Sequence, residues 1–188
     1  MKKTLVMASL VAASTSMMAM DLQYFLGAGA ERANSNFRAT DVGIDNKIDI
    51  KDTSLKLSGG IIIDKTHRIY LSYSKFSDNN YDYKIEQNNI LGNYDYLIPI
   101  NEQFRLYTGL HLGNTKVDIQ ENALYKISFS GLAYGAQFGA IYEITKNIEF
   151  EAGLAYTKYN VDREADGSYF NIELEDSTSM FAGINYKF

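Results

Sequence analysis

Apolar and polar residues alternate one by one along most of the chain from residue 24 onward. In residues 104–113, which read FRLYTGLHLG, every even position except Thr108 is apolar, and the odd positions include an arginine, a histidine and two glycines. Successive side chains of a β-strand point to opposite faces, so this period of two predicts strands with one apolar face each. Eight segments show the pattern, although residues 81–89 break register with the fourth of them: 24–31, 54–63, 68–74, 92–98, 104–113, 131–142, 148–157 and 179–188.

The two faces of these segments differ in a way that a water-soluble fold does not explain. An eight-stranded sandwich or lipocalin-like barrel would bury its apolar faces, but here the opposite faces are small and polar, with Gly and Ser where a core needs Leu or Val. A polar interior and an apolar exterior are typical of a barrel that stands in lipid. Tyrosines near the ends of the apolar faces would form its aromatic girdles, in the absence of tryptophan: Tyr24, Tyr94, Tyr96, Tyr142, Tyr156 and Tyr186. We therefore predict an all-β fold, an eight-stranded antiparallel transmembrane up-and-down β-barrel.

The connections between the segments fall into two classes. Breaks near Asp64–His67, Pro99–Glu102 and Thr145–Asn147 are short. The other set holds three long polar segments, with a shorter break at 78–80 between them: Asn34–Asp52, Asp118–Ile127 and Val161–Asp176. Short turns at one end and long loops at the other are typical of outer-membrane barrels, in which the short turns are periplasmic. We expect the three long segments to be extracellular loops.

The N-terminal residues and the composition indicate export of the chain and exclude some classes of chemistry and partner. Lys2 and Lys3 precede a short apolar stretch and several small residues, which predicts a secretory signal peptide in residues 1–20 and a barrel domain in residues 21–188. The chain contains no cysteine, which excludes disulfides and thiolate chemistry. Its net charge of −5 and pI near 5.0 argue against nucleic acid as a partner, because that binding needs a basic face.

The last residues, FAGINYKF, resemble the C-terminal strand of bacterial outer-membrane barrels. In that family a terminal Phe follows outward residues at every second place, and a Gly lies farther back; the matching positions are Phe188, Tyr186, Ile184 and Gly183. The resemblance implies recognition by the barrel-assembly machinery. As a whole, residues 21–188 resemble the small barrels grouped with the OmpA transmembrane domain, OmpX and the opacity proteins. The resemblance implies Sec-dependent export to the outer membrane of a Gram-negative cell, in contact with its lipid and lipopolysaccharide.

The predicted inner faces carry ionisable residues of both signs. Eight strands leave a lumen just wide enough for side chains, so unpaired charges there would be costly. We expect an ion-pair network among Glu31, Lys56, Arg68, Asp95, Arg105, Glu149, Glu151 and Lys187. Asp95 and Arg105 are equidistant from residue 100, so we expect them to be paired across the hairpin. Such a network would plug the lumen, and the alternative is a gated ion path.

Catalysis and metal binding find little support in the sequence. The chain has two histidines: His67 falls in a short turn, and His111 points into the predicted lumen without a recognisable nucleophile beside it. Two isolated histidines without cysteine make no metal-ligand spacing. We expect no catalytic residue, no cofactor and no metal site, and the protein is interpreted as a non-enzyme.

Function is then expected in the loops. The segment 161–176 is strongly acidic, and Asp166, Tyr169 and Phe170 are its candidate contacts to a host or surface ligand; the alternative is a solvated loop that only keeps the surface hydrophilic. The leading hypothesis is a non-enzymatic surface protein with a structural or adhesive role. A small ion-conducting pore is the alternative, and a lipid A-modifying enzyme comes third.

Overall fold

The computed structural model describes residues 21–41, 44–80, 83–121, 125–164 and 170–188. The predicted signal peptide lies outside these residues. The described chain forms eight strands: β1 (Leu22–Asp41), β2 (Ile44–Ile63), β3 (His67–Asn80), β4 (Tyr83–Pro99), β5 (Phe104–Glu121), β6 (Tyr125–Thr145), β7 (Ile148–Glu164) and β8 (Phe170–Lys187). No helix among the described residues is long and apolar enough to cross a membrane.

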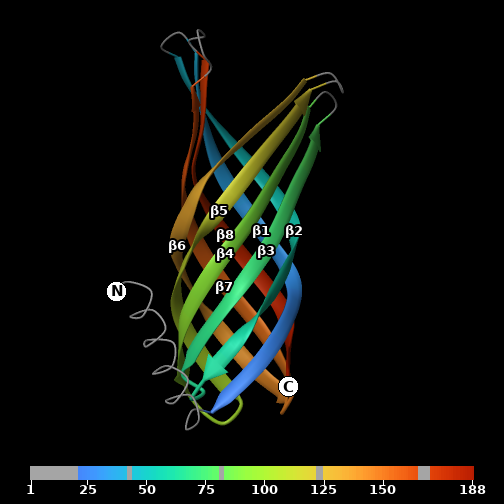
Figure 1. The fold of residues 1–188 in the computed structure, drawn as a ribbon, viewed down its shortest axis with the longest axis vertical. Helices are drawn as coiled ribbons and strands as arrows, with labels where there is room; N and C mark the ends of the chain where they lie inside the picture. Colours follow the sequence, from blue (N-terminus) through green and yellow to red (C-terminus); the bar gives the residue numbers. More distant parts are fainter. Residues whose placement is uncertain (1–20, 42–43, 81–82, 122–124, 165–169) are drawn as a thin grey trace, which may run out of the picture.

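The strands form a closed barrel in chain order (Figure 1). Each strand pairs with its neighbours in an antiparallel direction, and β1 closes the barrel against β8 with Ala30 opposite Ala182. The predicted up-and-down topology of eight strands is confirmed. Closure leaves no free sheet edge along the lower half of the barrel in Figure 1, which we call the lower barrel. A β-structure in lipid requires such closure.

The outer face of the lower barrel is apolar. Leu71, Leu110 and Phe138 point outward and keep 65%, 65% and 59% of their surface exposed. Leaving large aliphatic and aromatic side chains exposed in this way would be unfavourable in water, whereas hydrocarbon solvates them. The predicted assignment of apolar positions to the outside of the barrel is confirmed.

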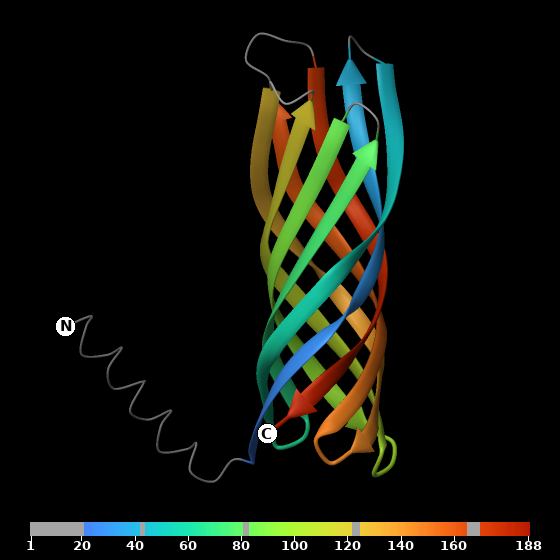
Figure 2. The ribbon, with the colours of Figure 1, turned by 90° about the vertical axis from the view of Figure 1, so that its right-hand side faces the viewer.

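The two ends of the barrel differ. Turns at 64–66, 100–103 and 146–147 lie at one end together with Asp21 and the C-terminal Phe188, and we call this the turn end (Figure 2). The backbone N–H of Asp64 donates to the carbonyl of Asp21 at 2.9 Å, which ties the first residue of the barrel domain to this end. The other ends of the strands lie at the opposite end of the barrel, which we call the open end.

The prediction of long loops at the open end was wrong. The polar segment 34–52 is mostly strand, because β1 continues to Asp41 and β2 begins at Ile44, in unbroken register with each other. Likewise β5 continues to Glu121 and β6 begins at Tyr125, and β7 and β8 extend to Glu164 and Phe170. Each of these strands continues beyond the last residue of the apolar alternation from which it was predicted.

Polar residues on the outer face explain why the pattern ends. Toward the open end the buried inward positions carry both polar side chains such as Gln87 and an apolar cluster around Val117 and Leu174, which we call the upper apolar cluster. On the outside, Lys116 and Lys158 take positions that are aliphatic lower on the same strands. The outer face is therefore polar toward the open end and apolar nearer the turn end.

This change on the outer face also corrects the interpretation of the fourth segment. Residues 81–89 appeared to break register, but β4 runs from Tyr83 to Pro99 without a register shift against either neighbour. Leu91 points inward and packs against the upper apolar cluster, whereas Ile90 is exposed on the outside. Beyond Ile90 the next outward position, Asn88, is polar, so the apolar series ends while the strand stays in register.

The barrel divides into two sheets at the open end. The last described pair between β2 and β3 is Leu55 with Lys75, and the last between β6 and β7 is Leu132 with Asn160. Above these pairs, β7, β8, β1 and β2 form one four-stranded sheet, and β3, β4, β5 and β6 form the other (Figures 1 and 2).

Candidate functional site

The lumen of the lower barrel is filled with charged side chains around Arg68 of β3. The Arg68 guanidinium donates from Nε and Nη2 to Oδ2 of Asp95 on β4, at 2.9 and 2.6 Å. It also donates from Nη1 and Nη2 to the two oxygens of Glu151 on β7, at 2.9 and 2.7 Å. All three side chains are buried. One cation thus joins two carboxylates across the lumen, in the fork geometry that suits arginine.

Neutral groups complete the hydrogen bonds of these carboxylates. Gln137 donates from Nε2 to Oδ1 of Asp95 at 2.6 Å and to the hydroxyl of Tyr70 at 2.7 Å. Asn185 donates to Oε2 of Glu151 at 2.8 Å. The guanidinium carbon of Arg68 lies 4.8 Å from the ring centres of Tyr70 and Tyr107, so aromatic faces cover the remaining cation surface.

The predicted Asp95–Arg105 pair is wrong. In the β4–β5 register Asp95 stands opposite Gly109, and Arg105 stands opposite Pro99. The hairpin is therefore centred two residues later than expected, because the turn spans 100–103. Arg105 is paired instead with Glu149 of β7.

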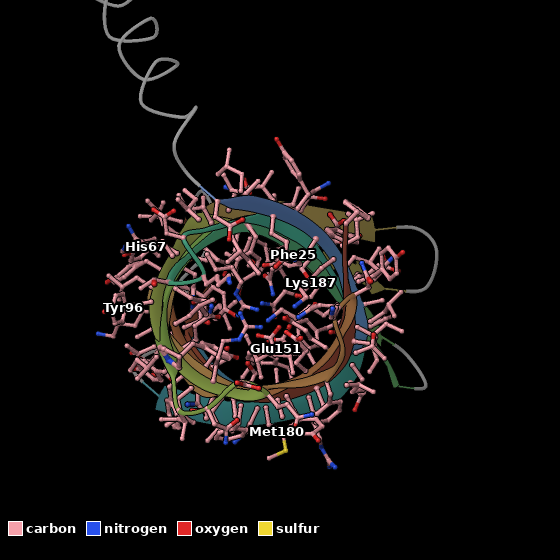
Figure 3. The ribbon with its side chains drawn as sticks, turned by 90° about the horizontal axis from the view of Figure 1, so that it is seen from below. Phe25, His67, Tyr96, Glu151, Met180 and Lys187 are labelled. Atoms are coloured by element: carbon pink, nitrogen blue, oxygen red, sulfur yellow. The ribbon has the colours of Figure 1, made fainter. Side chains whose placement is uncertain are left out.

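A second charged group lies nearer the turn end. Glu149 accepts from Arg105 and also lies 2.6 Å from Nζ of Lys187, which donates in turn to Glu143 at 2.7 Å. Glu143 was missed in the sequence because it lies beside the turn, outside the alternating part of β6. Figure 3 shows Glu151 and Lys187 inside the ring of strands, seen from the turn end.

Two residues of the expected network lie apart from these groups. Glu31 accepts a hydrogen bond from Ser179 at 2.7 Å. Nζ of Lys56 lies 3.6 Å from the ring centre of Phe181, a cation–π contact. The structure therefore brings six of the eight expected residues into two ion-paired groups and places these two beside them.

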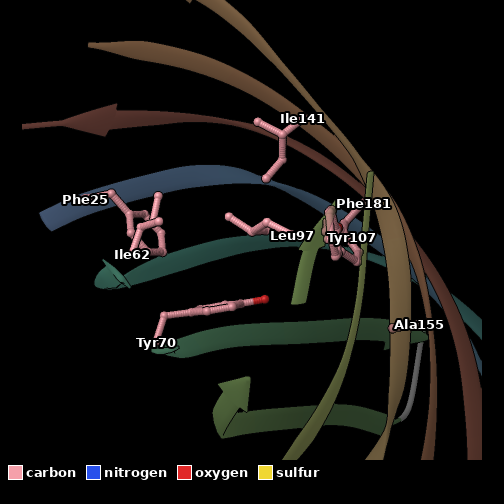
Figure 4. Close-up of a cluster of buried hydrophobic side chains, with 8 residues drawn as sticks. All are labelled: Phe25, Ile62, Tyr70, Leu97, Tyr107, Ile141, Ala155 and Phe181. Atoms are coloured by element: carbon pink, nitrogen blue, oxygen red, sulfur yellow. The ribbon is translucent and has the colours of Figure 1, made fainter. Parts of the chain in front are cut away.

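An apolar cluster in the lumen was not foreseen. Phe25, Ile62, Leu97 and Ile141 are buried near the turn end and belong to one cluster with Tyr70, Tyr107, Ala155 and Phe181 (Figure 4). A signal for it does exist in the sequence. Each of the first four is the middle of three consecutive apolar residues, so the inward position is apolar where the period of two predicts a polar one.

These groups leave little free volume in the lower lumen. A cavity bounded by Lys56, Tyr70 and Glu151 has about 30 Å³, and another beside His111 and Thr157 has about 20 Å³. Each is large enough for about one water molecule. Around these residues the lumen is thus filled by side chains.

The histidines occupy unrelated places. His111 is buried in the lumen, and its Nε2 lies 3.0 Å from the hydroxyl oxygen of Thr157. His67 lies on the outside at the turn end, where its Nδ1 is 2.8 Å from the hydroxyl oxygen of Tyr94 and its ring packs edge-on against Tyr96. Within the described residues, no group of three or more His, Asp or Glu side chains is arranged to hold a metal ion.

The residues of the C-terminal motif end β8 at the turn end. Ile184, Tyr186 and Phe188 are exposed on the outside, and the rings of the last two are 5.6 Å apart. Gly183 stands opposite Gly29 of β1, where the strands approach so closely that a Cβ on Gly29 would lie 2.3 Å from the carbonyl oxygen of residue 182. Of the candidate loop contacts, Asp166 and Tyr169 lie outside the described residues, and Phe170 begins β8.

Comparisons with known proteins agree with this architecture. A family model described as "Outer membrane protein beta-barrel domain" matches residues 5–188. No curated protein matches the chain by sequence.

Three solved structures illustrate the similarity in fold. Neisserial surface protein A (NspA) superposes with a TM-score of 0.66 at 19% identity, over 88% of this chain and 97% of that one. Outer membrane protein H (OprH) of P. aeruginosa has a TM-score of 0.60 at 26% identity, over 88% and 99% of the two chains. Ail, the attachment invasion locus protein of Yersinia pestis, has a TM-score of 0.57 at 16% identity, over 88% and 98%.

Proposed function

The chain belongs to the outer-membrane β-barrel family, and from this premise we propose that it is a non-enzymatic surface protein that interacts through its open end. In this proposal the Sec pathway exports the chain after recognition of residues 1–20, and the barrel is held in the outer membrane of a Gram-negative cell. The short turns then face the periplasm, and the extended strands project outside, in contact with lipopolysaccharide.

The observation that carries this proposal is the packed lumen. Arg68 spans the lumen between Asp95 and Glu151, and an apolar cluster fills the space nearer the turn end. An ion path needs a continuous column of water, and these side chains occupy its place. With the lumen filled, the surface available to partners is the open end, where both sheets project beyond the apolar outer face.

The strands at the open end provide an unusually large surface for so small a barrel. Strands β1 and β2 are each 20 residues long, whereas about 9–11 residues are enough to cross a membrane. Roughly half of each strand is therefore available outside the bilayer. The names of two relatives, a surface protein and an attachment protein, describe roles of this class, and this chain resembles those proteins in fold.

Ion conductance, cell adhesion and the lipid A of expressing cells test the proposal. Refolded protein in planar bilayers is expected to show no steady ion conductance. Expressing cells are expected to adhere to glass coated with extracellular matrix, at a cell density too low for contact between cells. A matched variant replaces residues 163–172 by an Asn-Gly turn, since Asp162 stands opposite Glu173, and it should reduce adhesion and leave the barrel intact. A large conductance would favour the pore. Lipid A altered by expression would favour the enzyme.

Assembly provides a separate prediction. We expect deletion of Phe188 to lower insertion into the outer membrane severalfold, because this residue ends the outward face of the closing strand and matches the position that the assembly machinery recognises. Its backbone N–H donates to the carbonyl of Tyr24 at 3.1 Å, so the deletion also removes one contact of barrel closure. Phe188→Tyr keeps that contact and an aromatic ring and serves as the control. The measurement is the heat-resistant, folded fraction in isolated outer membranes; equal fractions for the deletion and the wild type would refute the prediction.

A further inference from the structure

Division of the upper barrel leaves strand edges that the lower barrel does not have. Strand β2 pairs with β1 from Ile63 up to Ile44, but its pairing with β3 stops at Leu55. From Ile44 to Asp52, the described part of β2 therefore shows no backbone pairing on its β3 side. Every second residue of such an edge directs its N–H and C=O groups away from the sheet, which makes the edge a template for another strand. We call this stretch the β2 edge.

The sequence of the β2 edge is complementary to itself. Asp45, Lys47, Asp49 and Lys51 occupy alternate positions, which share one face of a strand. If two copies of the edge align in antiparallel fashion about Ile48, each Asp45 stands opposite a Lys51 and each Lys47 opposite an Asp49. Opposite charges in directly facing positions stabilise a strand pair, and like charges destabilise it. All four facing positions of this row are complementary in that single register.

We propose that the β2 edge docks onto the β2 edge of a second copy of this chain, in antiparallel register centred on Ile48. The inference deepens the proposed surface role, on which it rests, by naming the partner. The two copies extend the four-stranded sheet β7–β8–β1–β2 of each molecule into one eight-stranded sheet. Main-chain hydrogen bonds supply the attraction, and the charge row selects the register.

Strand direction determines where the second copy stands. In Figure 2 the upper part of β2 runs close to the long axis of the barrel. Antiparallel strands are related by a twofold axis perpendicular to them, so the two barrel axes point in opposite directions. Two copies in one membrane share a direction and cannot pair in this way. The partner is therefore held in a facing membrane, and docking joins two cells.

The length of the edge agrees with such an arrangement. Leu55 is 62% exposed on the apolar outer face, and Ile48 lies seven positions above it on β2. At about 3.3 Å per residue, the centre of the pair stands at most roughly 23 Å above Leu55, and the two apolar faces are at most roughly 45 Å apart. Each hairpin tip then ends near the level at which β2 and β3 of the other copy begin to pair.

The other edges that the division creates lack these features. On the sides where the two sheets divide, the other described stretches beyond the last pair are 78–80 on β3, 125–131 on β6 and 161–164 on β7, all shorter than the β2 edge. The sequence YKISFSG of residues 125–131 carries a single charge, so it has no complementary row. The self-complementary pattern is confined to β2 among these four stretches.

Two variants with equal composition and equal net charge test the register. Exchanging the charges at 45 and 51 (Asp45→Lys with Lys51→Asp) keeps opposite charges in every facing position. Exchanging those at 45 and 47 (Asp45→Lys with Lys47→Asp) places Lys opposite Lys and Asp opposite Asp. Each protein is refolded into phosphatidylcholine vesicles, and clustering of the vesicles is followed by light scattering. We expect the first variant to cluster within about twofold of the wild-type rate and the second to cluster at least about tenfold more slowly.

A complementation experiment makes the test independent of folding defects. Asp49→Lys with Lys51→Asp also places like charges opposite each other, but its row complements that of the 45/47 exchange. Vesicles of these two variants should each fail to cluster alone and should cluster when mixed, at about the wild-type rate. Cluster formation should also weaken at high salt, because salt screens the attraction between the charges of the two copies.

The outcomes separate this inference from the proposed function. Wild-type vesicles that stay dispersed, equal clustering of the two charge exchanges, or a mixture that does not recover would overturn the docking of the β2 edge. None of these results affects the surface role, which is tested by conductance and by adhesion of isolated cells. Conversely, an open lumen together with register-dependent clustering would refute the proposed function and leave the docking edge in place.

Discussion

Replacing Arg68 by alanine is expected to lower the free energy of unfolding by about 3–5 kcal/mol, the typical cost of breaking a buried ion pair by removing one partner. Arg68 holds both Asp95 and Glu151 through four hydrogen bonds in the lumen. Without the guanidinium, two buried carboxylates face each other with only Gln137 and Asn185 as donors. Water that enters the vacated space would lower the cost, so the upper figure applies to a lumen that stays dry.

A double-mutant cycle identifies the partner. Arg68→Ala combined with Asp95→Ala should cost less than the sum of the two single changes, because the double mutant leaves fewer charges without a partner. Arg105→Ala combined with Asp95→Ala is the matched control and should be additive within about 0.5 kcal/mol, since Arg105 is paired with Glu149. The measurement is urea unfolding in lipid vesicles. Coupling between Asp95 and Arg105 that equals the coupling between Asp95 and Arg68 would contradict the observed pairing.

The strands of the lower barrel could be predicted from the sequence because lipid and lumen impose opposite demands on adjacent residues. Leu110 and His111 are neighbours in the chain, yet one is exposed to the outside and the other is buried. This contrast repeats along every strand in the membrane, so the period of two is strong there. It also placed Arg68, Glu151 and Lys187 correctly inside the barrel.

The ion partners could not be predicted in the same way. Across a hairpin, the pairing depends on the residues that the turn takes, and a shift of the turn centre by two residues moved Asp95 from Arg105 to a position opposite Gly109. Across the lumen, the contact between Arg68 of β3 and Glu151 of β7 depends on the tilt and stagger of all the strands between them. The alternation within one segment specifies neither the position of the turn nor the tilt and stagger of the strands.

The upper strands were missed for a different reason. Above the bilayer the outer face meets water, and the inward positions carry both polar residues and the upper apolar cluster, so the outward apolar series ends. Ile90 followed outward by Asn88 marks this end on β4, and Leu112 followed outward by Asn114 marks it on β5. A prediction that follows only the apolar alternation places the end of the strand at such a point. The same change marks the height at which the barrel leaves the membrane.

The position of that boundary predicts how strongly a charged substitution on the outer face lowers the free energy of unfolding. Leu110→Arg is expected to lower the free energy of unfolding in vesicles by about 2–4 kcal/mol, the cost of a cation on the lipid face near the middle of the bilayer. Leu110 is exposed on β5 between Tyr94 and Ala136 of the adjacent strands, within an outward apolar series that extends from Phe104 to Leu112. No acidic residue stands opposite it in either register, so the new charge would lack an ion partner.

Asn114→Arg is the matched control for depth. Asn114 lies on the same strand and the same outer face, four positions nearer the open end and directly below Lys116 in that row. Because the cost of a cation falls to about 0–1 kcal/mol near the interface, this variant should unfold at nearly the wild-type urea concentration. Both variants are measured by urea unfolding in the same vesicles, with equal slopes required for the comparison. Equal costs for the two substitutions would mean that the bilayer boundary does not lie between Leu112 and Lys116, and that the change from apolar to polar residues on the outer face has another cause.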